Sequence, residues 1–222
     1  MASVPPQFHH ADLDYVAPYG CKKCPRLYQF IQDQKKDHPD WFNGAVPSFG
    51  SLESEILVVG LAPGLRGANA TGRPFTGDFA GDVLYQALLK HGFATGHFQK
   101  HAQDGVRLHN LRITNAVKCV PPQNKPTGDE INQCRDSFLI PEIKRMRHLK
   151  VILALGGIAH KALVKTFKMR QADMPFGHLK EYQLPNNVTL IDSYHCSRYN
   201  IQTNRLSMAM FDDVIGHLKS KL

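Results

Sequence analysis

The sequence lacks the features that mark several large classes of protein. No stretch approaches the roughly 20 consecutive apolar residues that a membrane-spanning helix needs. The stretch from Met1 to Ala17 contains Asp12 and Asp14 and has no apolar core of the kind found in secretory signals. No internal repeat or low-complexity tract is present. These absences exclude a membrane span and predict a cytoplasmic protein that makes no contact with a membrane.

Acidic residues are also in deficit. The chain has 27 Lys+Arg against 19 Asp+Glu, a formal net charge of +8. A basic excess favours polyanionic partners through phosphate contacts and counterion release. Charge alone does not separate a nucleic-acid-binding protein from any other basic enzyme. With 222 residues, of which 42% are hydrophobic, the chain is long enough for one domain, 1–222, with a core that needs no disulfides.

Short apolar runs rich in β-branched residues alternate with segments of helical spacing. The predicted strands are 55–60, 112–117, 151–155 and 188–192, and the predicted helices include 83–91, 158–167 and 206–218. Thr127 and Glu130 form a capping box at another helix start. This alternation predicts an α/β fold, a single-domain three-layer α/β/α sandwich around a central, mostly parallel four-stranded sheet.

Three long loops leave the ends of these predicted strands, at 60–78, 118–127 and 193–205. In open parallel sheets, functional loops gather at the carboxyl ends of the strands. We therefore expect the three loops to meet around one site.

Cysteine is scarce and unevenly spread, with five residues in the chain: Cys21, Cys24, Cys119, Cys134 and Cys196. A CxxC pair in a cytoplasmic protein suggests metal or redox chemistry more than a structural disulfide. With Cys119 and Cys134 it makes a four-thiolate set, and both zinc and an iron–sulfur cluster accept such a set. The alternative is that Cys134 is a core residue on a helix face and the CxxC pair stands alone. Cys196 lies in a different loop, and we interpret it as a bystander.

Four stretches of the sequence resemble one known family. They are the loop from Gly60 to Asp78, the segment Cys119-Val-Pro-Pro-Gln-Asn-Lys-Pro-Thr127, the strand Leu153-Ala-Leu-Gly156, and Ser193-Tyr-His-Cys-Ser-Arg198 with the Asn200, Gln202-Thr203 and Arg205-Leu206 that follow. These motifs resemble those of the family-5 (B-type) uracil-DNA glycosylases. Together with the cysteines, the matches run in family order from Cys21 to Leu206, about the whole chain.

The resemblance implies a monofunctional DNA glycosylase that hydrolyses the N-glycosidic bond of uracil. It also implies action on other deaminated bases, hypoxanthine and xanthine, with abasic sites left for base excision repair. The expected partner is DNA that contains such bases, bound by a monomer. The resemblance further implies a [4Fe–4S] cluster that pins the N-terminal segment, with four ligands: Cys21, Cys24, Cys119 and Cys134.

The same resemblance assigns roles in the site, and each assigned residue has an ordinary structural alternative. Asp78 stabilises the sugar cation or orients water, or is only a helix cap. His195 donates to the base oxygen as charge develops, or is a loop histidine. Asn124 holds the base edge or the water, or stabilises a turn. Phe75 stacks on the flipped base, or is ordinary core. The other implied substrate-binding residues are Gly60, Leu61, Ala62, Pro63 and Gly64.

Basic residues within or beside the motifs are candidates for contacts with the DNA backbone. They are Arg66, Arg73, Arg198 and Arg205. For each of them the alternative is a solvated surface arginine.

Two rival interpretations remain open. One is a family-4-like, uracil-only glycosylase, but family-4 enzymes have Glu where this chain has Leu61. The other is a non-catalytic, metal-stapled nucleic-acid-binding protein, which accounts equally well for the charge and the cysteines. Within the last motif, Tyr199, Ile201 and Asn204 differ from the pattern that we associate with family 5.

Overall fold

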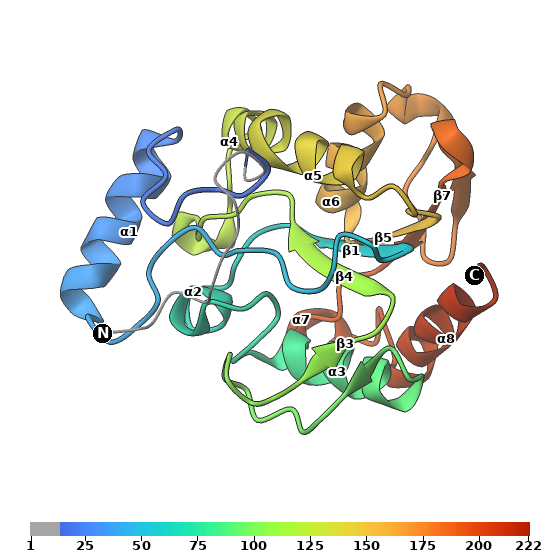
Figure 1. The fold of residues 1–222 in the computed structure, drawn as a ribbon, viewed down its shortest axis with the longest axis horizontal. Coiled ribbons are helices and arrows are strands. Elements are labelled where there is room, and N and C mark those ends of the chain that lie inside the picture. Colours follow the sequence, from blue (N-terminus) through green and yellow to red (C-terminus); the bar gives the residue numbers. More distant parts are fainter. Residues whose placement is uncertain (1–13) are drawn as a thin grey trace.

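A mostly parallel sheet forms the centre of the computed structural model, which describes residues 14–222 (Figure 1). The expectation that the first residues carry no secretory signal falls almost wholly on residues outside this range. The five strands run in the order β4-β1-β5-β7-β6. Their bounds are β1 Ile56–Gly60, β4 Leu111–Asn115, β5 Val151–Leu155, β6 Glu181–Gln183 and β7 Thr189–Ser193. Strands β4, β1, β5 and β7 pair in parallel, and β6 pairs antiparallel to β7.

The predicted α/β fold with a mostly parallel sheet is therefore confirmed, with one correction. The sheet has five strands and not four, because β6 adds an antiparallel edge. This strand is three residues long, and none of its residues is buried. So short and exposed a segment has no apolar run or alternation from which a strand can be predicted.

Helices cover both faces of the sheet (Figure 1). α4, α5 and α6 lie on one face, and α3 and α8 lie on the other. The helices are α1 Pro25–Asp37, α2 Ala68–Thr71, α3 Phe79–Lys90, α4 Gly128–Cys134, α5 Ile140–Arg145, α6 Gly157–Thr166, α7 Arg198–Gln202 and α8 Met208–Lys219. A π-helical turn at Arg135–Leu139 joins α4 to α5. Two short strands, β2 Ala94–Thr95 and β3 Arg107–Leu108, form a separate hairpin.

The core follows from the alternation of side chains along each strand. In β1, Ile56 and Val58 face the layer of α3 and α8, whereas Leu57 and Val59 face α6. Both faces are apolar, as expected for parallel strands that are covered on two sides. A third apolar cluster outside the sheet packs α1 against the chain that follows β4.

The loops that leave β1, β4 and β7 start at the same edge of the sheet, because these strands are parallel. The first of them ends at Asp78, where α3 begins. This helix starts four residues before the predicted Val83, since Asp78 caps it. The Thr127–Glu130 capping box is present at the start of α4. In the described part of the chain, no helix is both long and apolar enough to cross a membrane.

Candidate active site

A cavity of about 380 Å³ opens at the carboxyl edge of the sheet, between the three predicted loops. Its lining residues are Leu61, Ala62, Pro63, Gly64, Ala68, Phe75, Asp78, Phe79, Ala80, Asn115, Asn124, His195, Ser197 and Arg198. The three candidate catalytic residues, Asp78, Asn124 and His195, are thus brought together from separate loops. A binding pocket of a few hundred Å³ with several convergent polar groups is the usual form of a small-ligand site.

Asp78 both caps a helix and lines the cavity. Its Oδ1 accepts a hydrogen bond of 2.9 Å from the Gly81 amide, which is the structural role proposed as its alternative. Its Oδ2 lies against Gly64 and Gly67, and a Cβ at Gly67 would overlap this carboxylate. The glycines therefore allow the loop to close directly onto Asp78. The cap fixes the side chain in one orientation and leaves the second oxygen for another partner.

His195 follows β7 and is half-buried in the cavity wall. Burial lowers the pKa of this imidazole below its ordinary value, and the nearby Asp78 carboxylate opposes that shift. A lowered pKa keeps the ring neutral at pH 7, so one ring nitrogen carries a proton to donate. The backbone carbonyl of His195 accepts a hydrogen bond of 2.8 Å from the Asn200 side chain, which fixes the loop at this residue.

Two asparagines contribute amide groups to the cavity. Asn124 is exposed and follows Gln123, and both residues have a left-handed backbone with φ near +57° and +56°. Asn115 is the last residue of β4 and is 4% exposed. We did not predict a role for Asn115, because the predicted strand 112–117 places it inside a strand, whereas β4 ends at this residue, at the edge where the functional loops begin.

The predicted substrate-binding loop lies along the cavity with one exception. Leu61, Pro63 and Gly64 line the cavity together with Ala62, whereas Gly60 is not among the lining residues. A Cβ at Gly60 would lie 2.7 Å from the Phe75 ring, so the glycine makes room behind that ring. The Phe75 ring also stacks on His195, with centroids 5.9 Å apart. Phe75 is thus both a core residue, 6% exposed, and part of the cavity wall.

The four predicted DNA-contact arginines divide into two groups. Arg66, Arg198 and Arg205 are exposed. Arg198 lines the cavity with its guanidinium 5.3 Å from the Phe79 ring, and Arg205 borders a neighbouring cavity of about 260 Å³. Arg73 is different, because it is 4% exposed and forms an ion pair of 2.7 Å with Asp104. Its guanidinium is not available to a phosphate, so the predicted contact of Arg73 with the DNA backbone is wrong.

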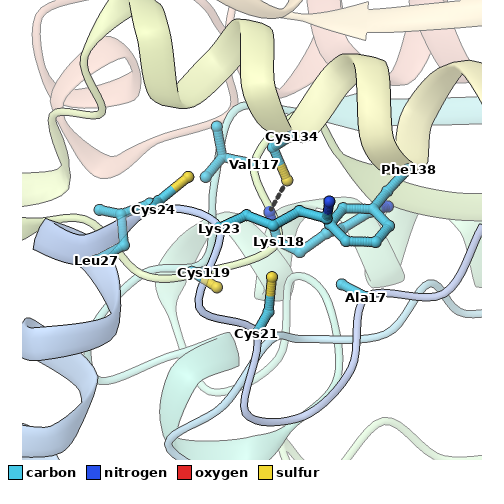
Figure 2. Close-up of a pocket in the computed structure, with 10 residues that line it drawn as sticks. All are labelled: Ala17, Cys21, Lys23, Cys24, Leu27, Val117, Lys118, Cys119, Cys134 and Phe138. Atoms are coloured by element: carbon cyan, nitrogen blue, oxygen red, sulfur yellow. Dashed lines mark hydrogen bonds between the residues drawn. The ribbon is translucent and has the colours of Figure 1, made fainter.

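The four cysteines of the predicted metal set lie around one small, largely apolar cavity (Figure 2). In this view Cys24 and Cys134 are above the space, and Cys119 and Cys21 are below it. The Cys134 thiol accepts a hydrogen bond of 3.2 Å from the Lys118 amide. Among the described residues, no three side chains of ligand-forming type are gathered tightly enough to hold a single ion as they stand. Cys196 is apart from this set, since its thiol is buried against the Ala80 carbonyl.

Burial raises the pKa of the Cys24, Cys119 and Cys134 thiols. For Cys134 the value rises to about 11, although the Lys118 amide and ammonium oppose the rise. The pKa of Cys119 is raised further, by burial and by the other three thiols. Four thiolates crowded into an apolar site need a positive charge among them. The donor set therefore fits a cationic metal centre with four sulfur ligands.

A salt link ties the cysteine-bearing segment to the loop of Asn124. The Arg26 guanidinium donates to both carboxylate oxygens of Glu130, at 2.8 and 2.7 Å, and to the Lys125 carbonyl at 3.1 Å. Arg26 lies two residues after Cys24, and Lys125 follows Asn124 directly. The N-terminal segment thus supports one wall of the candidate active site.

Known proteins resemble the chain over most of its length. The model of the uracil DNA glycosylase superfamily matches residues 47–219. A type-5 uracil-DNA glycosylase of Thermus thermophilus is 40% identical over 206 residues, which cover 90% of this chain and 93% of that protein. A type-5 uracil-DNA glycosylase of Mycobacterium tuberculosis is 37% identical over 208 residues, 90% of this chain and 77% of that protein. A type-4 uracil-DNA glycosylase of Pyrobaculum aerophilum is 34% identical over 152 residues, 68% of this chain and 63% of that protein.

Proposed function

Because the chain belongs to the type-5 uracil-DNA glycosylases of the uracil-DNA glycosylase superfamily, we propose that it hydrolyses the N-glycosidic bond of uracil in DNA and leaves an abasic site. The observation that carries this proposal is the convergence of Asp78, Asn124 and His195 on one cavity from three strand-end loops. A target base within a duplex is out of reach, so the nucleotide must be flipped into this cavity.

Inside the cavity, Phe75 offers its ring as a stacking surface for the base. Asn115 and Asn124 each carry one acceptor and two donors, a combination that suits the alternating carbonyl and imide groups on the edge of uracil. Leu61 and Ala62 give the wall an apolar surface that excludes water. These contacts orient the glycosidic bond toward the two groups that act on it.

Cleavage builds positive charge on the sugar and negative charge on the departing base. The Asp78 carboxylate, fixed by its cap to Gly81, stabilises the sugar cation or orients the attacking water. The neutral His195 donates a hydrogen bond to the base oxygen where negative charge develops. Uracil departs as a fairly stable anion, so it needs stabilisation at this oxygen more than full protonation.

We further propose that hypoxanthine and xanthine are substrates. Small side chains along the wall, at Ala62, Gly64 and Ala68, support this broader range, because they leave room for a purine. Leu61 stands where family-4 enzymes have a carboxylate that would occupy part of such a space.

Oligonucleotides that contain uracil, hypoxanthine, xanthine or a G·T mismatch test the substrate range. We expect alkali-labile sites at uracil, hypoxanthine and xanthine after incubation with the protein. Product from uracil alone would favour the narrower, family-4-like interpretation. No product from any base would favour a protein that only binds DNA.

The exposed arginines at the cavity rim are proposed to hold phosphates beside the flipped nucleotide. Replacing Arg198 by alanine should weaken DNA binding and reduce the slope of log K against log salt concentration by about 1, since each phosphate contact contributes roughly 0.9 to that slope. Arg205→Ala should do the same. Fluorescence anisotropy with labelled duplex at several salt concentrations measures this slope.

Lys165→Ala is the matched control for this experiment. Lys165 is an exposed cation in the last turn of α6, at the opposite end of that helix from the cavity edge. Its removal should leave the slope unchanged. Equal slopes for Arg198→Ala and Lys165→Ala would remove the phosphate role from Arg198.

The cysteine set is proposed to hold a [4Fe–4S] cluster through Cys21, Cys24, Cys119 and Cys134. Four thiolates suit either zinc or iron–sulfur chemistry. The resemblance of the motifs to those of the family-5 enzymes favours the iron–sulfur cluster, and the four thiols lie around one shared space. The cluster is structural in this proposal, because its ligands join the start of α1, the chain after β4 and the end of α4.

A further inference from the structure

Phe75 has a backbone conformation that a bulky residue rarely adopts. Its φ is +52°, in the left-handed region that favours glycine. Strained residues of this kind persist only where the surrounding structure over-determines them, and they gather at functional sites. The residues around Phe75 must therefore stabilise a backbone conformation that phenylalanine itself disfavours.

Both neighbours of Phe75 in the chain are held by hydrogen bonds. The Pro74 carbonyl accepts from the Tyr85 hydroxyl at 3.1 Å, and the Thr76 carbonyl accepts from the Thr71 hydroxyl at 3.0 Å. On the other side, a Cβ at Gly81 would overlap the Phe75 carbonyl, so α3 packs directly on this peptide. The ring is thereby directed into the cavity wall against Gly60.

Arg73 is the buried centre of this support. Its Nε donates to the Thr76 hydroxyl at 2.8 Å, and its two terminal nitrogens donate to Asp104 at 2.7 Å each. The guanidinium carbon lies 5.0 to 5.6 Å from three aromatic rings, which belong to Phe49, Tyr85 and Phe98. Two parallel hydrogen bonds between the planar Arg73 guanidinium and one carboxylate fix the orientation of both groups. A lysine could not form this pair of hydrogen bonds.

Asp104 completes the arrangement from a segment distant in the sequence. It lies in the loop between β2 and β3, and its side chain is fully buried. Besides Arg73, it accepts backbone hydrogen bonds of 3.1 Å from Gln99 and from Val106. Burial alone would raise the pKa of Asp104, but Arg73 and these two amides lower it to about 2. The carboxylate is therefore charged and fixed at every pH of interest.

We propose that Arg73 and Asp104 are positioning residues that hold Phe75 in its left-handed conformation, so that its ring is ready to stack on a flipped base. Neither residue lines the cavity. Their effect passes through Thr76 and the Phe75 backbone. This inference rests on the stacking role proposed for Phe75.

Equilibrium binding to two duplexes tests the proposal. One duplex carries 2′-fluoro-deoxyuridine, whose fluorine disfavours the sugar cation and so prevents excision during the measurement. The other carries a tetrahydrofuran abasic analogue, which has no base to stack. Phe75→Ala should weaken binding to the first duplex by about tenfold, within the range of one base–aromatic stack. It should leave binding to the second duplex within about twofold.

Asp104→Asn should weaken binding to the uracil analogue by about three- to tenfold, again without a matching loss on the abasic analogue. The double variant Phe75→Ala/Asp104→Asn should bind no more weakly than Phe75→Ala alone, because residues that act through one another are not additive. Losses that multiply in the double variant, or equal losses on both duplexes, would overturn the proposal.

Two further variants keep the test decisive. Tyr85→Phe removes only the hydroxyl that holds the Pro74 carbonyl, so it tests the same support if Asp104→Asn fails to fold. It should show a smaller loss that is likewise absent in the Phe75→Ala background. Lys100→Ala is the control, since Lys100 lies in the loop of Asp104 but forms only a surface ion pair with Asp82. Excision of ordinary uracil by the wild-type protein tests the proposed function separately.

Discussion

Replacing Asp78 by asparagine is expected to slow single-turnover excision of uracil and of hypoxanthine by similar factors, on the order of 10²–10⁴. In the proposed mechanism Asp78 acts at the sugar and the water, which every substrate shares. Asparagine keeps the cap on the Gly81 amide, since it is as good an N-cap residue as aspartate. The substitution therefore removes the carboxylate and leaves the start of α3 in place. Rapid-quench measurements with excess enzyme give the rates directly.

The control for this prediction is Ser207→Ala. Ser207 caps α8 through a hydrogen bond of 3.0 Å to the Met210 amide and does not line the cavity. Its loss should cost about 1 kcal/mol of stability, as for a typical N-cap, and should leave the excision rate unchanged. If Asp78→Asn folds and excises every base at the wild-type rate, Asp78 is only a helix cap.

His195→Ala gives the contrasting half of the same prediction. In the proposed mechanism His195 contacts the departing base, so its removal should alter the ratio of uracil to hypoxanthine excision, in contrast to the uniform effect expected for Asp78→Asn. The expected loss on uracil is roughly 10²–10³, the effect of removing one preorganised donor. An unchanged ratio would mean that His195 does not act on the departing base.

Replacing one of the four proposed cluster cysteines should have a large effect on iron content and on thermal stability. Anaerobically purified wild-type protein should be brown and contain about four irons per chain, as a [4Fe–4S] cluster requires. Cys21→Ala or Cys134→Ala should lose the colour and most of the iron, and the thermal midpoint should fall. The fall is expected because metal binding and folding are coupled where ligands join distant segments. Iron analysis, absorbance and calorimetry measure the three quantities.

Cys196→Ala is the matched control for the ligand variants. Cys196 is buried, as Cys134 is, but it packs against Ala80 and is apart from the four-cysteine cavity. It should keep the wild-type colour and iron content. Stoichiometric zinc without iron in the anaerobic wild-type preparation would contradict the cluster proposal and favour a zinc site.

The four parallel strands of the fold could be predicted from the sequence, whereas the short strands at its margins could not. Strand 151–155 is predicted with its observed bounds, and the bounds of β1, β4 and β7 differ from the predicted ones by at most two residues. These strands contain several β-branched residues, and nearly all of their residues are buried. Strand β6 and the β2–β3 hairpin are two or three residues long and are held by tertiary pairing. Nothing in their local pattern favours a strand.

The part of the site that lies in the strand-end loops and the sequence motifs could be predicted. These features placed Asp78, Asn124 and His195 on loops that the structure brings to one cavity. They could not separate Arg73 from the exposed arginines, because its partner Asp104 lies 31 residues away in a loop with no motif. Asn115 was missed because the predicted strand 112–117 places it inside a strand, whereas the observed β4 ends at this residue.

The most direct test of the central claim is the product of one turnover on uracil-containing duplex. Among the described residues, none of those that line the cavity is a lysine, and we propose that water is the nucleophile. The account predicts free uracil, a strand that breaks only after alkali, and no protein–DNA adduct when borohydride is added during the reaction. A trapped adduct, a strand cut without alkali, or uracil that stays in the DNA would contradict it.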